Sequence, residues 1–272
     1  MDSSLPERNL SLWRIATEPD VDLRKVAIHA STVPDVAAAI VRYANSAYVG
    51  AAFPVGTVLG AVVRVGSRTV GALALAAASR GLMGGWGTAE NWEDALVVGR
   101  AARLTGRLAG VTRDESEELF VAGLFSGIGT MQLSQRDSGY LPWRRRLISQ
   151  GHFSEEIVYR EEMVYGADHA AMSGRILTQW GFPTSVAAAV AAHHRPSESK
   201  VERSLAAAMA ITGRESEIGG CIDSDFEFAL STLNLEEHAT FIRTEATLFA
   251  EAAVAAVIGG ESETDSAEVA SG

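Results

Sequence analysis

Hydrophobic residues recur at intervals of three and four along nearly the whole chain, and this spacing is what most limits its fold. Val36, Ala39, Ile40 and Tyr43, for instance, would share one face of a helix. Runs that alternate apolar and polar residues, which would indicate strands, are scarce, and the strong helix formers alanine and leucine are frequent. The sequence therefore predicts an all-α fold.

Residues that favour helix ends mark the expected boundaries. Thr112-Arg113-Asp114-Glu115 is a capping box, and we expect the helix that it opens to run on toward Leu133. Pro34 suits the first turn of another helix. The expected helices lie at about 10–13, 23–27, 34–45, 58–65, 67–82, 90–109, 112–133, 143–149, 154–165, 202–214 and 236–258, with further helices in 166–196.

Charge and cysteine content exclude several classes of protein. The formal net charge of −11 argues against binding to nucleic-acid polymers or to anionic membranes, both of which need a basic surface. Cys221 is the single cysteine, so no intrachain disulfide can form, which suits a reducing cytoplasm. The first residues lack the pattern of a signal peptide, and the charge-free run from Thr69 to Ser79 is far short of the ~20 apolar residues of a membrane span. We expect a cytoplasmic protein.

Three of the six histidines lie in the stretch from Gly166 to Pro196, which makes it the candidate chemical centre. His169 precedes a helical segment, and His193 and His194 end an Ala-rich one. These side chains are either residual metal ligands or histidines that are hydrogen-bonded within a helical core. We favour the second interpretation, because adjacent residues on a helix point about 100° apart and would not readily share one ion without a partner helix.

A basic cluster is the candidate for binding a ligand or a partner. Arg144, Arg145 and Arg146 follow Trp143, and the planar guanidinium suits phosphates and carboxylates. The alternative is a solvated helix face anchored by the tryptophan. The glycines Gly123, Gly127 and Gly129 lack an accompanying basic residue, so we expect close helix packing there rather than a phosphate cradle.

The order of short motifs resembles that of the HDOD family, a degenerate branch of the HD superfamily of metal-dependent phosphohydrolases, over residues 5–258. The matching motifs are Glu18-Pro19-Asp20, Val33-Pro34-Asp35, Asn45-Ser46-Ala47, Thr57–Val62 with Val65-Gly66, Ala122–Phe125 with Ile128-Gly129, Glu161 or Glu162, Gly166 with His169, Gly174, Leu177, Trp180, Pro183 and His193-His194. Joint order and spacing, rather than any one motif, carry the resemblance.

The resemblance implies a metal site that this sequence has lost in part. Ser126-Gly127 stands where the superfamily has its His-Asp doublet, and Asp94 stands where its first histidine is expected. Thr212 is the nearest polar residue to the position of the last aspartate. His169, His193 and His194, with Asp94 as a substitute, are therefore expected to be vestigial ligands. We expect no required cofactor, with a divalent metal as the alternative.

The resemblance also implies the architecture and the function. It implies a two-lobed helical domain, with lobes of about 5–110 and 111–258; a division near Gly84 to Ala89 is the alternative. Residues 259–272 are small and acidic without an apolar period, and this composition predicts a disordered tail. The resemblance implies a bacterial signalling module that does not catalyse a reaction and binds a regulatory protein partner or a small ligand, at the degenerate site or between the lobes. The alternatives are a phosphohydrolase with a remodelled metal site and a receptor for a nucleotide such as a cyclic dinucleotide. The sequence sets no oligomeric state.

Overall fold

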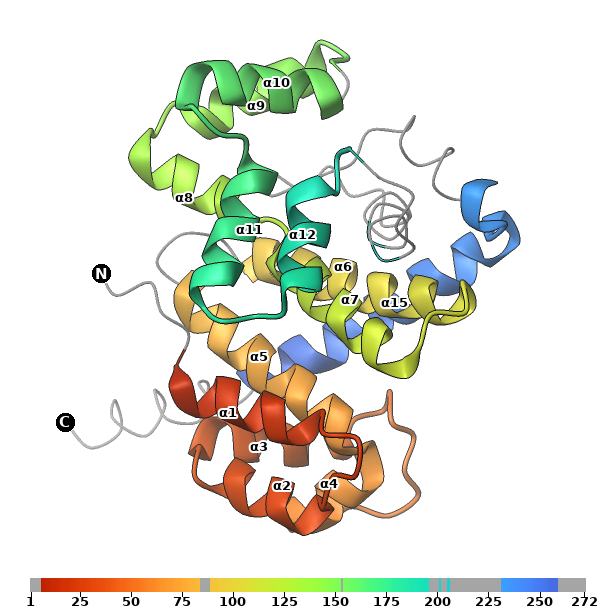
Figure 1. Cartoon of the computed structure of the whole chain (residues 1–272). Coiled ribbons are helices and arrows are strands. Elements are labelled where there is room, and N and C mark those ends of the chain that lie inside the picture. Colours follow the sequence, from red (N-terminus) through yellow and green to blue (C-terminus); the bar gives the residue numbers. More distant parts are fainter. Residues whose placement is uncertain are drawn as a thin grey trace, which may run out of the picture. The chain divides into compact units, whose positions relative to one another are not determined.

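A computed structural model describes residues 6–83, 89–152, 154–195, 201, 205 and 231–258, and every element in this part of the chain is a helix (Figure 1). The all-α prediction is confirmed. The helices are α1 (Glu7–Ala16), α2 (Leu23–Ser31), α3 (Pro34–Ala44), α4 (Val58–Val65), α5 (Ser67–Met83), α6 (Ala89–Leu108), α7 (Arg113–Phe125), α8 (Ile128–Arg136), α9 (Tyr140–Ser149), α10 (Ser154–Tyr165), α11 (His169–Gln179), α12 (Thr184–Ala192), the 3-10 helix η1 (Glu236–His238) and α15 (Ala239–Ile258).

Several predictions lie outside the described residues. They concern the helix at 202–214, the positions of Thr212 and Cys221, and the acidic tail at 259–272.

Contacts divide the chain into two compact units, Met1–Met83 with Leu248–Gly272 and Gly84–Thr247. The first unit is therefore built from both ends of the sequence. The second unit holds the helices from α6 to α12 and the beginning of α15. The lobe boundaries expected from the sequence stay a prediction.

The first unit packs α1 on α5 and sets α4 against α2 and α3. Asn9 is buried in this core, and its side-chain amide donates to the carbonyl oxygen of Ala74 at 2.9 Å. The C-terminal part of α15 completes the core, because Phe249 lies edge-on to the Tyr43 ring at 6.0 Å. Arg42 Nε also donates to the carbonyl of Ala256 at 2.6 Å.

The second unit is organised around close packing of α6 on α7 and of α11 on α8 and α12. A Cβ on Gly123 of α7 would lie 2.7 Å from the Cα of Gly99 on α6, so only glycine allows the two backbones to approach so closely. Close packing is thus confirmed at Gly123. Arg103 of α6 and Glu117 of α7 add a buried ion pair at 2.8 Å.

The capping box is confirmed, but the prediction of one helix from Thr112 toward Leu133 is wrong. Thr112 N–H donates to the Glu115 carboxylate at 2.7 Å, and Glu115 N–H donates to the Thr112 hydroxyl at 3.3 Å. The helix then ends at Phe125, and α8 begins at Ile128. The apolar spacing carries across this break, so the periodicity alone does not show it.

No single described helix is both long and apolar enough to cross a membrane. The pair α4 and Ser67–Ser79 of α5 meets the same criteria of length and composition together, but it is bent by 110°.

Candidate functional site

The stretch that follows α10 places His169 at the start of a helix. Gly166 adopts a positive φ of 77°, which glycine tolerates without strain, and the chain reverses there. Asp168 then caps α11, with its carboxylate accepting from Ala171 N–H at 2.6 Å. The cap fixes the first turn of α11, and His169 is its first residue.

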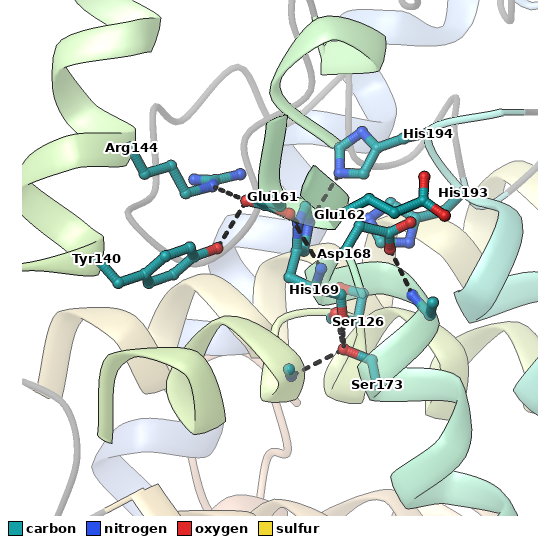
Figure 2. A network of polar contacts seen from close by, with 12 residues as sticks. Ser126, Tyr140, Arg144, Glu161, Glu162, Asp168, His169, Ser173, His193 and His194 are labelled. Carbon is teal, nitrogen blue, oxygen red and sulfur yellow. Dashed lines mark hydrogen bonds and ion pairs between the residues drawn. The ribbon is translucent and has the colours of Figure 1, made fainter. Parts of the chain in front are cut away.

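His169 is held by a buried carboxylate from α10. The backbone N–H and the ring Nδ1 of His169 both donate to Glu161 Oε2, at 3.0 and 2.6 Å (Figure 2). Because a carboxylate only accepts hydrogen bonds, Nδ1 carries the proton. The other ring nitrogen, Nε2, then presents its lone pair to the remaining histidines.

The second carboxylate oxygen of Glu161 is bound from α9. Tyr140 donates its hydroxyl to Oε1 at 2.7 Å, and Arg144 Nε lies 3.5 Å from the same oxygen. Burial would raise the pKa of Glu161, but His169, which adds a positive charge to its hydrogen bonds when its ring is protonated, and the charge of Arg144 outweigh burial and lower that pKa to about 2. Burial is also the main cause that raises the pKa of Tyr140 well above its ordinary value.

The end of α12 brings the other two histidines to the same point. The helix stops at Ala192, so His193 and His194 lie beyond its last turn, and their ring centroids are 4.1 Å apart. The divergence expected for neighbours on a helix does not apply, because both residues lie beyond α12 and the third ring comes from another helix, α11. His193 Nδ1 lies 2.6 Å from the carbonyl oxygen of Val190, which only accepts, so this nitrogen also carries a proton.

The three rings form one buried cluster. His169, His193 and His194 are 1%, 0% and 2% exposed, and they offer ring nitrogens that lie within 4.8 Å of one another. The two Nε2 atoms of His169 and His194 are 2.9 Å apart. Within the described chain, His193 Nε2 and His194 Nδ1 are buried without a hydrogen-bond partner. Burial, reinforced by His169, lowers the pKa of His193 to about 3, and burial lowers that of His194 well below 6.5.

Ser126 and Gly127, which the resemblance places where the superfamily has its His-Asp doublet, lie at a closely packed junction between α7 and α8. Ser126 donates its hydroxyl to the carbonyl of Gly123 at 2.9 Å. The hydroxyl of Ser173 on α11 accepts from Gly129 N–H at 2.8 Å and lies 2.7 Å from the Ser126 carbonyl oxygen (Figure 2). A Cβ on Gly129 would collide with the backbone carbonyl of His169. The break between α7 and α8 is thus joined to α11, and Ser126 keeps its hydroxyl within its own turn.

The other candidate residues, Asp94 and the three arginines of α9, do not come together as the histidines do. Asp94 is on α6, and the group of buried side chains that could hold a metal among the described residues does not include it. Arg144 is buried beside Glu161, whereas Arg145 and Arg146 are exposed on α9. The three arginines therefore do not form one surface cluster. Their role in binding stays a prediction.

The histidine cluster could hold a metal ion. Hydrogen bonds fix Nδ1–H on both His169 and His193, so their Nε2 lone pairs face the cluster, as metal-ligating histidines require. Three neutral imidazoles suit Zn²⁺, Cu²⁺ or Ni²⁺ better than Mg²⁺ or Mn²⁺, which prefer oxygen ligands. Ser126 and Gly127, the residues expected at the place of the doublet, offer neither a carboxylate nor an imidazole to a second metal.

Glu161 and Tyr140 are parts of this site that sequence reasoning did not assign. Glu161 belongs to a family motif, but its pairing with His169 depends on how α10 turns back onto α11. Tyr140 and Arg144 are four residues apart on α9, a spacing that places both on one helix face. Only that spacing could have indicated that the two side chains share a partner.

The fold and the site define an all-helical domain with a buried cluster of three histidines. The sequence matches the HDOD domain family across residues 3–196, and the chain belongs to this family. No curated protein matches it in sequence.

Solved structures show the same fold. An HDOD domain protein of unknown function from Geobacter sulfurreducens has a TM-score of 0.68 and 18% identity, with 90% of this chain and 92% of that chain covered. A protein from Shewanella amazonensis SB2B, named provisionally as a phosphohydrolase, has a TM-score of 0.68 and 18% identity, with 92% and 94% covered. A protein from Marinobacter aquaeolei VT8, named provisionally as a signal transduction protein, has a TM-score of 0.72 and 19% identity. There, 92% of this chain is covered, but it spans 59% of that chain.

Proposed function

We propose that this chain is a non-catalytic regulatory module that binds a partner protein. The observation that carries the proposal is the closed junction between α7 and α8. Ser126 and Gly127 replace the doublet, and Ser173 binds the backbone on both sides of the break. This frame supplies neither a bridging carboxylate nor a fourth imidazole to a metal.

Burial of the histidines supports the same conclusion. Hydrolysis of a phosphate ester at a metal requires that the substrate reach a metal-bound water. His169, His193 and His194 are almost fully buried, and Glu161 is itself fully buried behind His169. The carboxylate orients a ring and is not placed to act on a substrate from solvent.

The exposed arginines of α9 support a partner with acidic groups. Arg145 and Arg146 project from the helix that Arg144 anchors through Glu161. Guanidinium groups bind carboxylates and phosphates in two-point contacts, and in a protein of net charge −11 they are a local attraction for an anion. Binding there should weaken with added salt.

A hydrolysis assay tests the non-catalytic part of the proposal. Untagged protein is incubated with an activated phosphodiester and with Mn²⁺, Fe²⁺, Zn²⁺ or no metal. We expect the rate to equal that of a His169→Ala variant under every condition. Turnover that the His169→Ala variant loses and the His238→Ala variant keeps would contradict the proposal and support a remodelled phosphohydrolase. His238 is a suitable control because it lies on η1, away from the cluster residues in sequence, and is partly exposed.

Capture from native cells tests the partner. The full chain and an Arg145→Glu, Arg146→Glu variant are used as bait in parallel. An Arg160→Glu, Arg175→Glu variant, at exposed positions of α10 and α11, is the charge-matched control. A protein retained by the wild type and the control, but not by the double variant, supports the proposal. Calorimetric titration with nucleotides, including cyclic dinucleotides, runs alongside. Heat of binding that the wild type shows and the double variant lacks would identify the ligand at these arginines as a nucleotide instead of a partner protein.

A second candidate function is the holding of a metal ion that stabilises the second unit. It is favoured by His193 Nε2, which is buried and has no hydrogen-bond partner among the described residues. His169, His193 and His194 would hold the ion, and Glu161 would orient His169. A metal bound there would supply Lewis acidity, and its bonds to the three histidines would link α11 to the end of α12.

Elemental analysis and thermal unfolding test the metal. We expect untagged protein to bind one Zn²⁺, Cu²⁺ or Ni²⁺ and to unfold at a higher temperature when the ion is present. His193→Gln should lose the ion, and His238→Gln should retain it. If the protein contains much less than one metal ion per chain, and chelation leaves its unfolding temperature unchanged, the histidines are a hydrogen-bonded part of the core and not a metal site.

A further inference from the structure

The carboxylate of Glu161 connects the helix of the exposed arginines to the helix of the first histidine. Its Oε1 accepts from the Tyr140 hydroxyl of α9 at 2.7 Å and lies 3.5 Å from Arg144 Nε. Its Oε2 accepts from the backbone N–H and the ring Nδ1 of His169 on α11 (Figure 2). The two oxygens of one buried side chain therefore hold α9 on one side and α11 on the other.

The connection continues from His169 to the end of α12. Nδ1 of His169 carries the proton that Glu161 accepts, so its Nε2 has the lone pair and accepts a hydrogen bond from Nε2 of His194 at 2.9 Å. Glu161, His169 and His194 are at most 2% exposed, so water does not compete for these contacts. A chain of buried hydrogen bonds thus runs from α9 to the histidine cluster.

Apolar packing also holds α9, but it does so with less directional control. Tyr140 lies in a core cluster with Leu133 and Met172, and Trp143 lies edge-on to Tyr165 with the ring centroids 5.9 Å apart. The backbone of α9 packs on α8 and α10 much less extensively than α6 packs on α7. Because hydrophobic contact is non-directional and hydrogen bonds are directional, we expect the carboxylate to fix the orientation of α9.

This connection should be firmer when the histidine cluster holds an ion. His169 would then give its Nε2 lone pair to the ion in place of the hydrogen bond from His194, and the plane of its ring would be fixed. A ligating histidine and the carboxylate that accepts from its other nitrogen orient one another. The second oxygen of Glu161 would then stay in one position for the side chains of α9 that bind it.

The exposed arginines follow Arg144 directly along α9. Arg145 and Arg146 are exposed, whereas Arg144 is 2% exposed and lies beside Glu161. Fixing Arg144 therefore fixes the backbone from which its two neighbours project. A surface that is ordered before binding loses less entropy when a partner docks, so its affinity is higher.

We propose that the histidine cluster regulates the arginine surface of α9, because an ion bound by the three histidines orders α9 through Glu161. This inference rests on the two functions proposed above, the partner at α9 and the metal at the cluster. Tyr140 and Arg144 are positioning residues in it, since they act through the carboxylate. Linkage requires the converse as well: an acidic partner that prefers ordered α9 raises the affinity of the cluster for its ion by the same factor.

Hydrogen–deuterium exchange of the full, untagged chain tests the ordering of α9, with Zn²⁺ as the probe. Loading with Zn²⁺ should slow exchange of the α9 amides by at least about fivefold, and the amides of α1 in the first unit should not change. Tyr140→Phe removes the hydroxyl from Glu161 and keeps the ring in its packing. This variant should still bind Zn²⁺, but the ion should slow its α9 amides by less than about twofold.

Tyr165→Phe is the matched control for the loss of a hydroxyl. Tyr165 belongs to the same group of aromatic rings, but its hydroxyl donates to Asp137 at 2.9 Å and not to Glu161. The control should therefore respond to Zn²⁺ like the wild type. Circular dichroism of both variants establishes that they keep the fold.

Binding of a fluorescent hexaglutamate peptide tests the effect on the arginine surface. Protein loaded with Zn²⁺ and freed of excess ion should bind the peptide at least about fivefold more tightly than chelated protein. Tyr140→Phe should lose this difference, and the Arg145→Glu, Arg146→Glu variant should not bind. Equal behaviour of loaded and chelated wild type, including no binding in either, would refute regulation of this surface.

The exchange data separate failure of the regulation from failure of the metal site. If the wild type binds Zn²⁺ and exchange in α9 does not change, the regulation is wrong and the metal site stands. Equal slowing in Tyr140→Phe and the wild type would exclude the connection through this hydroxyl. Equal slowing in every helix of the second unit would indicate general stabilisation instead. If no Zn²⁺ binds, the regulation and the metal site are both wrong, and the capture experiment still decides the partner.

Discussion

At the scale of single residues, the sequence identified the three histidines but not what holds them. Their grouping followed from the spacing of His169, His193 and His194 within one stretch, and the structure brings their rings together. The role of Glu161 could not be predicted, because it depends on the turn at Gly166 that folds α10 back onto α11. Arg144 was grouped with its neighbours as a surface cluster, whereas it is buried against that carboxylate.

Replacing Glu161 by Gln should destabilise the protein far more than the same change at its neighbour. The substitution leaves the buried charge of Arg144 without its carboxylate and weakens the hold on His169, so we expect a loss of about 3 kcal/mol in the free energy of unfolding. Glu162→Gln is the control, because Glu162 forms only a half-exposed ion pair with Arg195 at 3.6 Å, and its loss should cost under about 1 kcal/mol. Urea unfolding measures both, and equal losses would show that the buried network adds nothing to stability.

At the scale of helices, the spacing of apolar residues and the capping residues predict most helices well. The main error is a break between two helices that tertiary packing causes. The helices at 58–65 and 154–165 have the predicted bounds, because apolar spacing and start signals agree there. The break at Ser126-Gly127 was missed, since the same apolar period continues into α8. What separates the two helices is the approach of α11, whose Ser173 binds on both sides of the break.

That approach predicts a severe effect of Gly129→Ala. The added methyl group would collide with the carbonyl of His169 and meet Ser173 N at 2.9 Å, and neither backbone atom can move without shifting α11. We expect a loss of about 3 kcal/mol in the free energy of unfolding, within the range of large effects from overpacking. Gly56→Ala is the control, because its Cβ would meet nothing within 4 Å and should leave thermal unfolding nearly unchanged. A similar small change for both variants would refute close α8–α11 packing.

At the scale of the whole molecule, the buried histidines should make the protein sensitive to acid. In the unfolded chain these rings take up protons near the ordinary value of 6.5, whereas burial holds native His193 neutral down to about 3. The unfolded state therefore binds more protons between these values, and the free energy of unfolding falls as the pH drops. Each such histidine contributes a slope of up to about 1.4 kcal/mol per pH unit.

The carboxylate of Glu161 also makes the free energy of unfolding fall with pH, but at lower pH than the histidines do. The stability that Glu161 gains from its depressed pKa is present above 4.5 and is lost as the pH falls toward 2. Urea unfolding of chelator-treated protein at a series of pH values measures both effects. A His193→Gln, His194→Gln variant should show a shallower decline between pH 6.5 and 4, and a flat wild-type curve over that range would contradict the burial of neutral imidazoles.

The return of α15 to the first unit also has a measurable effect on stability. Phe249 is buried against Tyr43, so Phe249→Ala should cost about 3–5 kcal/mol. Leu248→Ala, at the preceding and partly exposed position, should cost much less. Thermal unfolding of the two variants compares them, and similar losses would argue against a core that joins the two ends of the chain.

The discontinuous first unit has a consequence for the order in which a ribosome completes this protein. Residues 6–83 are synthesised before the second unit, yet Tyr43 and Arg42 must wait for Phe249 and Ala256, which are synthesised after it. The apolar surface around Tyr43 that Phe249 covers in the folded protein stays exposed to water while the whole second unit is synthesised. Residues 6–83 therefore depend on protection from aggregation until α15 has been synthesised.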